Sequence, residues 1–504
     1  MGNVIVTSNN LLDSNVEAYV YLLEHEFDFG KLAEASKKLF VPLNDAVKQR
    51  GFMGKAGSSL MVNGIHNEKS AYLILLGIGD LKEGLLNVEV CRRAIGQLVR
   101  IIESHKIASV AIKLPEPTLL GLSYSRLAQE TTSIIYTAKY HFDEFITSPD
   151  RKMHWKFDVQ LNVPQNAVEQ SQDGVDLGVV IGTALNKARY LCDMPPSRLT
   201  PTIFANKAEV IAKDYGLKYT VFNEKQVIEM GMGGLEGVSR GSTEECRFLI
   251  LEYSAPDKEA PTVAIVGKGV TFDSGGLSLK PAAAMESMKD DMAGAAIVVS
   301  VMEVIAQTKP SVNVLAFVPL TENMPSGSAI KPGDVLRFYN GKTAEVLNTD
   351  AEGRLILADA LSYAVKNYTL DAIVDVATLT GMCAHFFGPY YAGLFSQNDN
   401  LATKVLAASK TSGDRVWRLP MDEDYRAAVI SDIADLSNTG RGDVKSGAIT
   451  AAFFLDAFVD NVPHLHLDIA GVAFGPPKMP YFRTGATGFG IRLLVDLIMN
   501  WKKG

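Results

Sequence analysis

Apolar and polar positions alternate along the chain in a way that predicts strands interleaved with helices. In the first third, apolar runs rich in β-branched residues lie at 3–7, 59–62, 71–76 and 107–113, each with the length of a buried strand. Between 86 and 105 the apolar residues recur at helical spacing, at Val88, Cys91, Ile95, Leu98, Ile101 and Ile102. This pattern predicts an amphipathic helix, and the alternation as a whole predicts an α/β domain.

A polar interruption follows between residues 147 and 174. It contains the sequences SPDRK and QNAVEQSQDG, and only 155–163 within it has the pattern of a strand. We therefore predict that the first domain ends near residue 168. The predicted architecture is a smaller N-terminal α/β domain, 1–168, and a larger C-terminal α/β domain, 169–504, with a central mixed sheet flanked by helices.

The second region begins with a predicted helix, 177–191, that stops before two prolines. Predicted strands follow at 217–221, 248–252, 262–266, 312–318, 344–347 and 372–376. Two of these strands lead into conspicuous sequences. The strand 262–266 leads into VGKGVTFDSGGLSLK, the first run (266–280), and 344–347 leads into NTDAEGR, the second run (348–354). Because ligands bind at the carboxyl ends of strands in open α/β sheets, we predict that both runs lie at one end of one sheet.

The two runs and the KDDM sequence between them bring acidic and basic residues together without any His or Cys. Asp273, Asp291, Asp350 and Glu352 supply four carboxylates, and Lys268 could join them as a neutral amine. Buried carboxylates repel one another unless some bind protons or metal ions. Two divalent ions about 3.5–4 Å apart would balance the charge and generate a bridging hydroxide. Oxygen ligands favour Mg²⁺, Mn²⁺ or Zn²⁺, so we predict a hydrolytic two-metal site.

Each of these sequences also has an ordinary structural explanation. Thr349 and Glu352 fit a helix capping box. The DSGG sequence that begins at Asp273 is typical of a turn, and Asp291 with the preceding aspartate could stabilise a helix N-terminus. None of the three sequences establishes a metal site alone. Their predicted position at one end of a sheet favours the site.

Composition excludes several classes of protein. The 504 residues are 47% hydrophobic and 21% charged, which is typical of a globular protein with a large core. The net charge of −8 gives no support to nucleic-acid binding. The four cysteines are widely spaced, as in proteins of a reducing compartment. With neither a signal peptide nor an apolar stretch of about 18 residues, we expect a cytoplasmic protein with no membrane span.

The second run extends to NTDAEGRLILADAL (348–361), and this sequence resembles the signature of the leucyl (cytosol) aminopeptidases. The first run with the downstream DMAGAA (291–296) is similar to the other metal-binding region of that family. The resemblance continues through ATLTG (377–381), SGAITAA (446–452), HLDIAG (466–471) and TGFGIRLL (487–494), and covers most of the chain after residue 188. His464 departs from it, since tryptophan is frequent there.

The resemblance implies a role for each residue of the site. Lys268, Asp273, Asp291 and Glu352 would hold one Mn²⁺ or Zn²⁺ ion, and Asp273, Asp350 and Glu352 the other. Lys280 and Arg354 would be the catalytic cations. Arg354 and the backbone of Ala351, Gly353 and Leu355 would bind bicarbonate as the general base. An apolar pocket for the first substrate side chain would be formed by Met288, Thr378, Gly381, Ala470 and Ala473.

We therefore expect an aminopeptidase that removes leucine and other apolar residues from the N-termini of peptides. The resemblance further implies a homohexamer. Two alternatives stay open: a two-metal phosphoesterase, which usually has His ligands, and a non-catalytic DNA-binding role as in some bacterial relatives. Hydrolysis of a leucine amide rather than a phosphate ester would distinguish the first alternative. Salt-dependent DNA binding would support the second.

Overall fold

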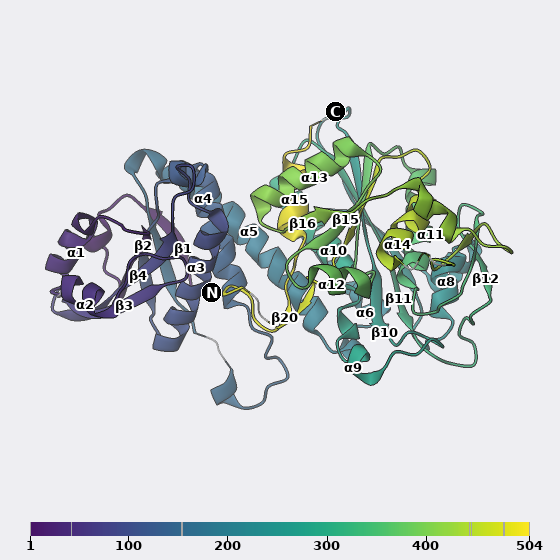
Figure 1. Cartoon of the computed structure of the whole chain (residues 1–504), viewed down its shortest axis with the longest axis horizontal. Helices are drawn as coiled ribbons and strands as arrows, with labels where there is room; N and C mark the ends of the chain where they lie inside the picture. The colour runs from purple at the N-terminus through teal and green to yellow at the C-terminus, as the bar shows by residue number, and fades with distance from the viewer. Residues whose placement is uncertain are drawn as a thin grey trace. The chain divides into compact units, whose positions relative to one another are not determined.

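The computed structural model describes residues 2–41, 43–152, 155–442, 444, 446–476 and 479–502. The chain divides into two compact units (Figure 1): an N-terminal unit of Met1–Asn186 with Pro477–Arg483, and a C-terminal unit of Lys187–Pro476 with Thr484–Gly504. The predicted two-domain α/β architecture is confirmed. The long helix α5, Val168–Asp193, begins at the residue where we placed the domain boundary, and the division between the units falls inside it.

The N-terminal unit is a six-stranded sheet in the order β1-β6-β5-β2-β4-β3. Its strands are β1 Val4–Thr7, β2 Ala18–Glu24, β3 Ser59–His66, β4 Lys69–Gly79, β5 Ser109–Lys113 and β6 Asp158–Asn162. Its helices are α1 Ala33–Lys38, α2 Leu43–Arg50, α3 Val88–His105 and α4 Tyr124–Lys139. All neighbouring strands are parallel except β3, which is antiparallel to β4 at one edge.

Both faces of this sheet are covered. In β2, Ala18, Val20 and Leu22 belong to one hydrophobic core, which includes α3 and α4. Tyr19 and Leu23 belong to a second core on the opposite face. This alternation is the two-residue period of a strand buried on both sides, and no strand at β2 was named in the sequence prediction.

A short segment from late in the chain completes the N-terminal unit. Tyr481 is 2% exposed and its hydroxyl donates to Glu89 at 2.9 Å. Its backbone packs on Gly96, where an added Cβ would lie 2.6 Å from the Tyr481 nitrogen. Arg483 forms an ion pair with Glu103. The segment therefore belongs to this unit and contributes Tyr481 to its core.

The C-terminal unit is built on a larger mixed sheet, in the order β16-β15-β18-β14-β9-β11-β8-β7 with β10 paired to β11. Its strands are β7 Lys218–Asn223, β8 Arg247–Tyr253, β9 Thr262–Gly267, β10 Gly269–Asp273, β11 Asn313–Asn323, β14 Ala372–Ala377, β15 Ala392–Phe395, β16 Val416–Arg418 and β18 His464–Asp468. Short strands lie outside it: β12 Val335–Arg337, β13 Thr343–Glu345, β17 Leu436–Ser437, β19 Phe474–Gly475 and β20 Gly485–Ala486.

Helices pack on both faces of the larger sheet. The helices of this unit are α6 Pro201–Tyr215, α7 Glu224–Glu229, α8 Gly233–Ser239, α9 Ala282–Met285, α10 Ala293–Thr308, α11 Gly353–Asn367, α12 Gly381–Phe387, α13 Asp399–Ser412, α14 Gly447–Asp456 and α15 Ile491–Met499. Helix α10 packs on β9, β11 and β14 together with α6 and α15, and α11 packs on β9 and β11 together with α8 and α14. The strands predicted at 262–266, 312–318 and 372–376 are confirmed as β9, β11 and β14.

The prediction that both runs follow strands of one sheet is wrong for the second run. The first run does follow β9, and part of it is itself a strand, β10. The second run follows β13, which belongs to a separate three-stranded sheet in the order β12-β13-β17. Ala344 and Val346 belong to the same hydrophobic core as the larger sheet and α11, whereas Leu347 is exposed, so hydrophobicity alone could not identify the sheet of this strand.

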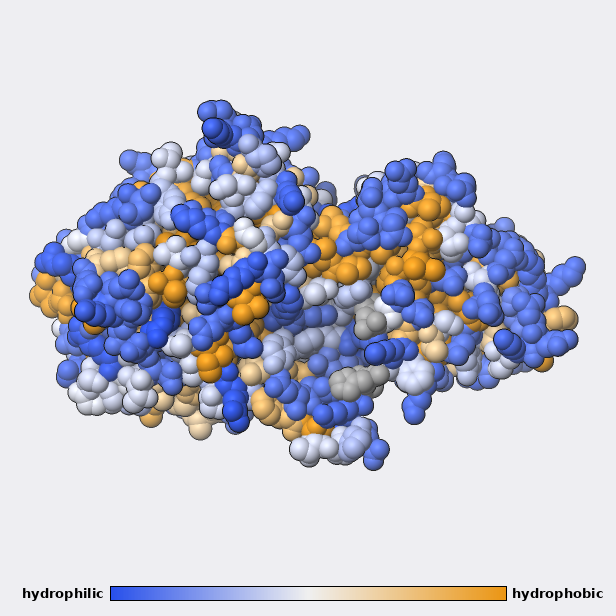
Figure 2. Space-filling view, turned by 180° about the vertical axis from the view of Figure 1, so that it is seen from behind, coloured by the Kyte–Doolittle hydropathy of each residue, from blue (hydrophilic) through white to orange (hydrophobic). Residues whose placement is uncertain are grey.

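One stretch, Ala282–Thr308, is long and apolar enough to cross a membrane, and 89% of its most apolar window is buried inside the protein. This burial is that of a core helix, in keeping with the position of α10 against the sheet. The face of the molecule in Figure 2 is predominantly hydrophilic, with hydrophobic residues in separate patches.

Candidate metal centre

Lys268 stands between β9 and β10 and is 2% exposed. Its backbone is fixed on both sides, because its nitrogen donates to the Val376 carbonyl at 3.1 Å and its carbonyl accepts from Ala295 at 2.9 Å. Its Nζ lies 2.7 Å from Asp291 Oδ1 and 2.9 Å from Glu352 Oε1. The structure thus brings a residue of the first run together with one of the second run and with Asp291.

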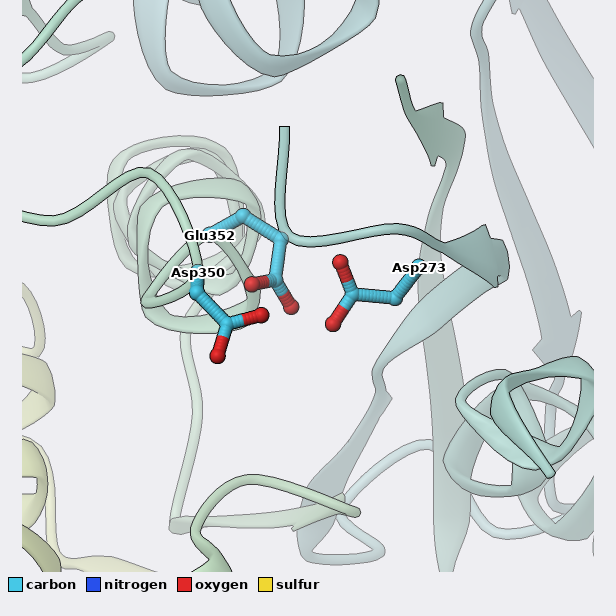
Figure 3. A group of neighbouring side chains, drawn as sticks. All are labelled: Asp273, Asp350 and Glu352. Carbon is cyan, nitrogen blue, oxygen red and sulfur yellow. The ribbon is translucent and has the colours of Figure 1, made fainter. Parts of the chain in front are cut away.

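Asp273, Asp350 and Glu352 form the acidic cluster of the site (Figure 3). One carboxylate oxygen from each lies within 4.8 Å of the others. Lys280 contacts the same cluster, with its Nζ 2.9 Å from Asp273 Oδ2 and 2.5 Å from Asp350 Oδ1. The five predicted metal ligands and the predicted catalytic lysine therefore lie together, although the two runs come from different sheets.

Glycines allow the two runs to approach so closely. Gly275 has a φ of 86°, and an added Cβ there would lie 2.8 Å from Asp350 Oδ1. At Gly353 an added Cβ would lie 2.5 Å from Lys268 Cε, so a larger residue would displace the lysine. Glu352 has helical backbone angles (φ −82°, ψ −35°) and directly precedes α11, so Asp350 and Glu352 do not lie on an extended strand. Both carboxylates nevertheless face Asp273.

Two polar residues that the sequence prediction did not include connect the two runs. Asn323, the last residue of β11, donates from Nδ2 to Asp273 Oδ1 at 2.8 Å and to the Thr349 carbonyl at 3.0 Å. Thr349 donates from Oγ1 to the Gly275 carbonyl at 2.7 Å and accepts from the Ser278 nitrogen at 2.8 Å. Both side chains are buried, so these contacts hold the acidic cluster in one arrangement.

Asn438 supports the second run from the other side. Its Oδ1 accepts from the Leu347 nitrogen at 2.8 Å, and its Nδ2 donates to the Asn348 carbonyl at 2.7 Å. Its own carbonyl accepts from Arg354 Nη1 at 2.7 Å. Asn438 is fully buried. It lies about ninety residues beyond the run it supports, and no local sequence pattern indicates this contact.

A third support lies beneath the loop 378–381. Asp468, at the end of β18, accepts from Thr380 Oγ1 at 2.5 Å and from the Leu379 nitrogen at 3.2 Å. The same loop presents Thr378, which donates from Oγ1 to Asp291 Oδ1 at 2.8 Å and accepts from Lys268 Nζ at 2.9 Å through its carbonyl. Asp468 thereby fixes a loop that contacts two predicted metal ligands, Asp291 and Lys268.

Burial and the charges of neighbouring groups act against each other in the electrostatics of the cluster. Burial raises the pKa of Asp273 to about 6, with the charge of Glu352 adding to the shift and Lys268 and Lys280 opposing it. It also raises the pKa of Asp291 well above its usual value. At Glu352 the charges of Lys268 and Lys280 outweigh burial and lower the pKa. Burial alone would lower the pKa of Lys268, but Asp291, Glu352 and Asp273 raise it strongly.

The protein alone therefore holds Lys268 as an ammonium that pairs with the carboxylates. A divalent cation in the cluster would replace that positive charge and lower the pKa of the lysine, which frees its nitrogen as a ligand. Among the described side-chain atoms, Asp291 Oδ2 and Glu352 Oε2 are buried and have no hydrogen-bond partner. Buried carboxylate oxygens without partners are costly, and they are suitable ligands for Mn²⁺ or Zn²⁺. The residues present fit the metal ions that the sequence predicts.

Arg354 lies in the first turn of α11 and is 6% exposed. Burial lowers the pKa of its guanidinium to about 10, with Glu352 and Asp468 opposing the shift. Its Nε is buried without a hydrogen-bond partner among the described groups, so this donor is not used within the chain. Of the neighbouring backbone groups predicted to bind bicarbonate, the Leu355 nitrogen donates to the Glu352 carbonyl at 2.9 Å and the Ala351 carbonyl accepts from Asn438 at 3.3 Å.

The predicted pocket residues lie on segments around the site. Thr378 contacts Asp291 directly, and Met288 opens the short 3₁₀ turn that leads to Asp291. Gly381 is exposed at the start of α12, where an added Cβ would contact nothing. Ala470 donates from its nitrogen to Asp468 at 3.2 Å, and Ala473 is 3% exposed. The structure thus bonds Thr378 directly to a predicted ligand, bonds Ala470 to Asp468 below the loop 378–381, and places Met288 shortly before Asp291 in the chain.

The fold and the donor set together define a two-domain α/β protein with a carboxylate-and-lysine centre suited to divalent metal ions. Comparison with protein families is specific: the catalytic domain of the cytosol aminopeptidase family matches residues 186–495, and the N-terminal domain of the same family matches residues 27–149. The chain belongs to the cytosol aminopeptidase family.

Relatives of known sequence and structure agree with this assignment. The chain is 40% identical over 467 residues to a probable cytosol aminopeptidase of Chlorobaculum tepidum, covering 89% of this chain and 90% of that one. It is 39% identical over 514 residues to a probable cytosol aminopeptidase of Chlorobium limicola, covering 99% and 100%. Among solved structures it is similar to the bottromycin maturation enzyme BotP in complex with Mn, with a TM-score of 0.84, 31% identity and coverage of 96% and 99%.

Proposed function

We propose that this protein is a metal-dependent aminopeptidase that removes leucine and other apolar residues from the N-termini of peptides. The observation that carries the proposal is the buried cluster of Asp273, Asp350 and Glu352 with two lysines against it. Carboxylate ligands that can hold divalent ions, with a separate cation beside them, support metal-assisted hydrolysis of an amide.

We assign the metal ligands as the sequence does. Lys268, Asp273, Asp291 and Glu352 would hold one divalent ion, and Asp273, Asp350 and Glu352 the other. Mn²⁺ or Zn²⁺ fits these oxygen and nitrogen donors, and the BotP relative was solved with Mn. When bound, the ions polarise the substrate carbonyl and activate water for attack. The unpartnered oxygens of Asp291 and Glu352 support this assignment.

Lys280 supplies a positive charge for the oxygen that becomes negative during attack. Its Nζ contacts Asp273 and Asp350, so it stays charged and within reach of any substrate bound at the cluster. The pKa of Lys280 is raised because these carboxylates outweigh its burial. A charge placed in advance at such a site accelerates reaction by about a hundredfold or more.

Arg354 would hold bicarbonate as the general base. Its planar guanidinium can bind an anion with two parallel donors, and its Nε has no partner among the described groups. Asn438 keeps the guanidinium in place through Nη1. The apolar pocket would be formed by Met288, Thr378, Gly381, Ala470 and Ala473, and its small and aliphatic side chains suit leucine.

The proposal includes the setting in which the protein acts. We expect a cytoplasmic homohexamer that acts on free peptides, without nucleic acid or membrane partners. Mass measured by light scattering tests the hexamer. A hexamer that dissociates on metal removal would also be consistent with the proposal, whereas a stable monomer with full activity would contradict it.

Leucine-amide hydrolysis by metal-stripped protein, with Mn²⁺, Zn²⁺, Co²⁺ or Mg²⁺ added back, tests the function directly. We expect no hydrolysis without metal and recovery with Mn²⁺ or Zn²⁺. Asp350→Asn should abolish the recovery while circular dichroism shows an unchanged fold. Full activity in thoroughly stripped protein would contradict the mechanism, and hydrolysis of a phosphate ester instead would contradict the substrate class.

A further inference from the structure

The C-terminal unit carries a group of exposed and half-buried aromatic side chains that the proposed reaction does not use. We name it the aromatic surface and define it as Phe386, Phe387, Tyr390, Tyr391 and Trp417. Neighbouring rings contact one another in a row: Phe386 with Phe387 at 4.8 Å between centroids, Phe387 with Tyr391 at 6.4 Å, and Tyr391 with Trp417 at 6.2 Å. Phe386 is 72% exposed and Trp417 is 59% exposed. Connected exposed aromatic residues are typical of a binding surface.

The sheet places this surface at the same edge as the metal centre. Lys268 follows β9, and the parallel strands β9, β14 and β18 end at that edge. Strand β15 is antiparallel to β18 and begins beside its end, directly after Tyr391. Strand β16 is parallel to β15 and begins directly after Arg415. Lys268, Tyr391 and Arg415 therefore lie along one edge of one sheet. Figure 1 labels α12, β15 and β16, the elements next to the aromatic surface.

The separation along this edge corresponds to a short peptide. In the order β16-β15-β18-β14-β9, β15 is three strands and β16 four strands from β9. At about 4.8 Å between strands, this places Tyr391 and Arg415 about 14 and 19 Å from the strand of Lys268. An extended peptide advances about 3.3–3.6 Å per residue. A peptide of about four to six residues would therefore reach from the metal centre to the far end of the surface.

A positive charge stands at the far end. The Arg415 guanidinium lies 5.0 Å from the Tyr391 ring centroid and 5.8 Å from that of Tyr390. Within the part of the chain that the structure describes, it forms no ion pair. The guanidinium is planar and can present two parallel donors, which suits a carboxylate. A short peptide has such a group at its C-terminus.

We propose that the aromatic surface and Arg415 are a second binding site for peptide substrates of about four to six residues. The rings would contact an aromatic or large aliphatic side chain near the peptide's C-terminus, and Arg415 would bind the free C-terminal carboxylate. This inference rests on the proposed aminopeptidase function and extends it. The protein would then select whole short peptides, and not only an N-terminal side chain.

The charge is tested with two pentapeptides that begin with leucine and end with phenylalanine, one a free acid and the other a C-terminal amide. With the unaltered protein, we expect KM to be about two- to fivefold lower for the acid, the range of a partly exposed ion pair. Arg415→Gln should remove this difference. Lys410→Gln is the control, because it removes one charge from an exposed lysine of α13 and should preserve the difference.

The rings are tested by the ratio of kcat/KM for the pentapeptide acid to that for leucine amide. We expect Phe386→Ala to lower this ratio about two- to tenfold, the value of an aromatic contact. Phe40→Ala is the control, since Phe40 is 78% exposed in the N-terminal unit and its loss should leave the ratio unaltered.

The outcomes distinguish failure of this inference from failure of the proposed aminopeptidase function. If the unaltered protein does not cleave leucine amide, the proposed function fails and this inference with it. If it does, but neither Arg415→Gln nor Phe386→Ala changes peptide selection, only this inference fails. It is also overturned if Phe386→Ala or Trp417→Ala changes the mass found by light scattering, because the surface is then a contact between copies of the chain.

Discussion

The two halves of the proposed metal centre are held in place by different means. Lys268 and Asp273 of the first run border or belong to β10, and β9 and β10 are hydrogen-bonded to neighbouring strands of the larger sheet. Asp350 and Glu352 of the second run follow a three-residue strand in a separate sheet. Their position depends on side-chain amides and a hydroxyl, chiefly those of Asn323, Thr349 and Asn438.

This difference has an energetic meaning. Backbone hydrogen bonds of a sheet are cooperative and need no particular side chain, so the first half tolerates substitution of its neighbours. In the second half a single side chain makes each set of supporting hydrogen bonds. Its loss leaves buried backbone groups without partners, at a cost of about 1–3 kcal/mol each. The second half should therefore be the more easily displaced.

The largest effect should come from removing a ligand, and it should be equal in the two halves. We expect Asp273→Asn and Glu352→Gln each to lower kcat/KM for leucine amide at least about a thousandfold, because each removes several kcal/mol of metal-assisted stabilisation. Glu322→Gln is the control, since Glu322 is a partly buried carboxylate on β11 that pairs with Ser242 rather than with the cluster. Substantial activity in either ligand variant would show that the two halves are not one centre.

The next effect should separate the halves. We expect Asn438→Ala to weaken metal binding and activity about ten- to a hundredfold, the usual result of losing a residue that orients a metal ligand. Titration with Mn²⁺ measures it. Asn313→Ala is the matched control for Asn438→Ala. Asn313 also joins backbone groups through its side-chain amide, at 2.9 Å to the Ala255 nitrogen and 3.0 Å to the Ala260 carbonyl, but it lies at the start of β11. This control should lower stability and leave metal affinity unaltered. Equal metal affinities in the two variants would contradict the comparison.

A pair of threonines gives a smaller and sharper test. Thr349→Val keeps the shape but breaks the bonds to Gly275 and Ser278 that join the two runs, and we expect activity to fall about tenfold. Thr271→Val changes a buried threonine of β10 whose hydroxyl has one long contact, 3.3 Å to the Thr321 carbonyl. Activity should change less than about threefold there. A larger loss at Thr271 than at Thr349 would reverse the difference between the halves.

The smallest effect concerns the first half, which the larger sheet holds in place. It tests whether a change in stability on a neighbouring strand, β18, leaves metal affinity unaltered. His464 on β18 lies 2.8 Å from Asp375 Oδ2, and Asp375 also lies 2.6 Å from His466 Nδ1. Burial would lower the pKa of His464, but Asp375 and Asp456 raise it to about 9. Because the folded pKa exceeds the usual value, the stabilisation is complete below about pH 6.5 and is lost as the pH rises through 9.

We expect thermal stability to fall between pH 6.5 and 9.5, with His464 contributing at most about 3 kcal/mol. His464→Asn should flatten this dependence, since asparagine does not titrate. Mn²⁺ affinity at a fixed pH should change little in this variant. A variant with the same pH dependence as the unaltered protein would show that another group is responsible.

The residues of the proposed metal centre could be identified from the sequence, and the residues that support them could not. The strand that leads to Lys268 was evident from its apolar run, and the ligands lie in short segments with recognisable spacing. Asn323 and Asn438 act on backbone groups far away in the chain, and a buried asparagine has no local pattern. The sheet to which β13 belongs was also wrongly predicted, because an apolar stretch shows that a strand is buried without showing which strand it pairs with.

The segment 479–483 has a consequence for the order in which the protein can fold. It contributes Tyr481 to the core of the N-terminal unit, although the chain reaches it only after the strands of the larger sheet. Domains generally fold in the order in which they leave the ribosome. The core of the N-terminal unit cannot be completed in that order, because Tyr481 is synthesised late. The first domain to be synthesised must wait, with Gly96 and Glu89 uncovered, until nearly all of the second has been made.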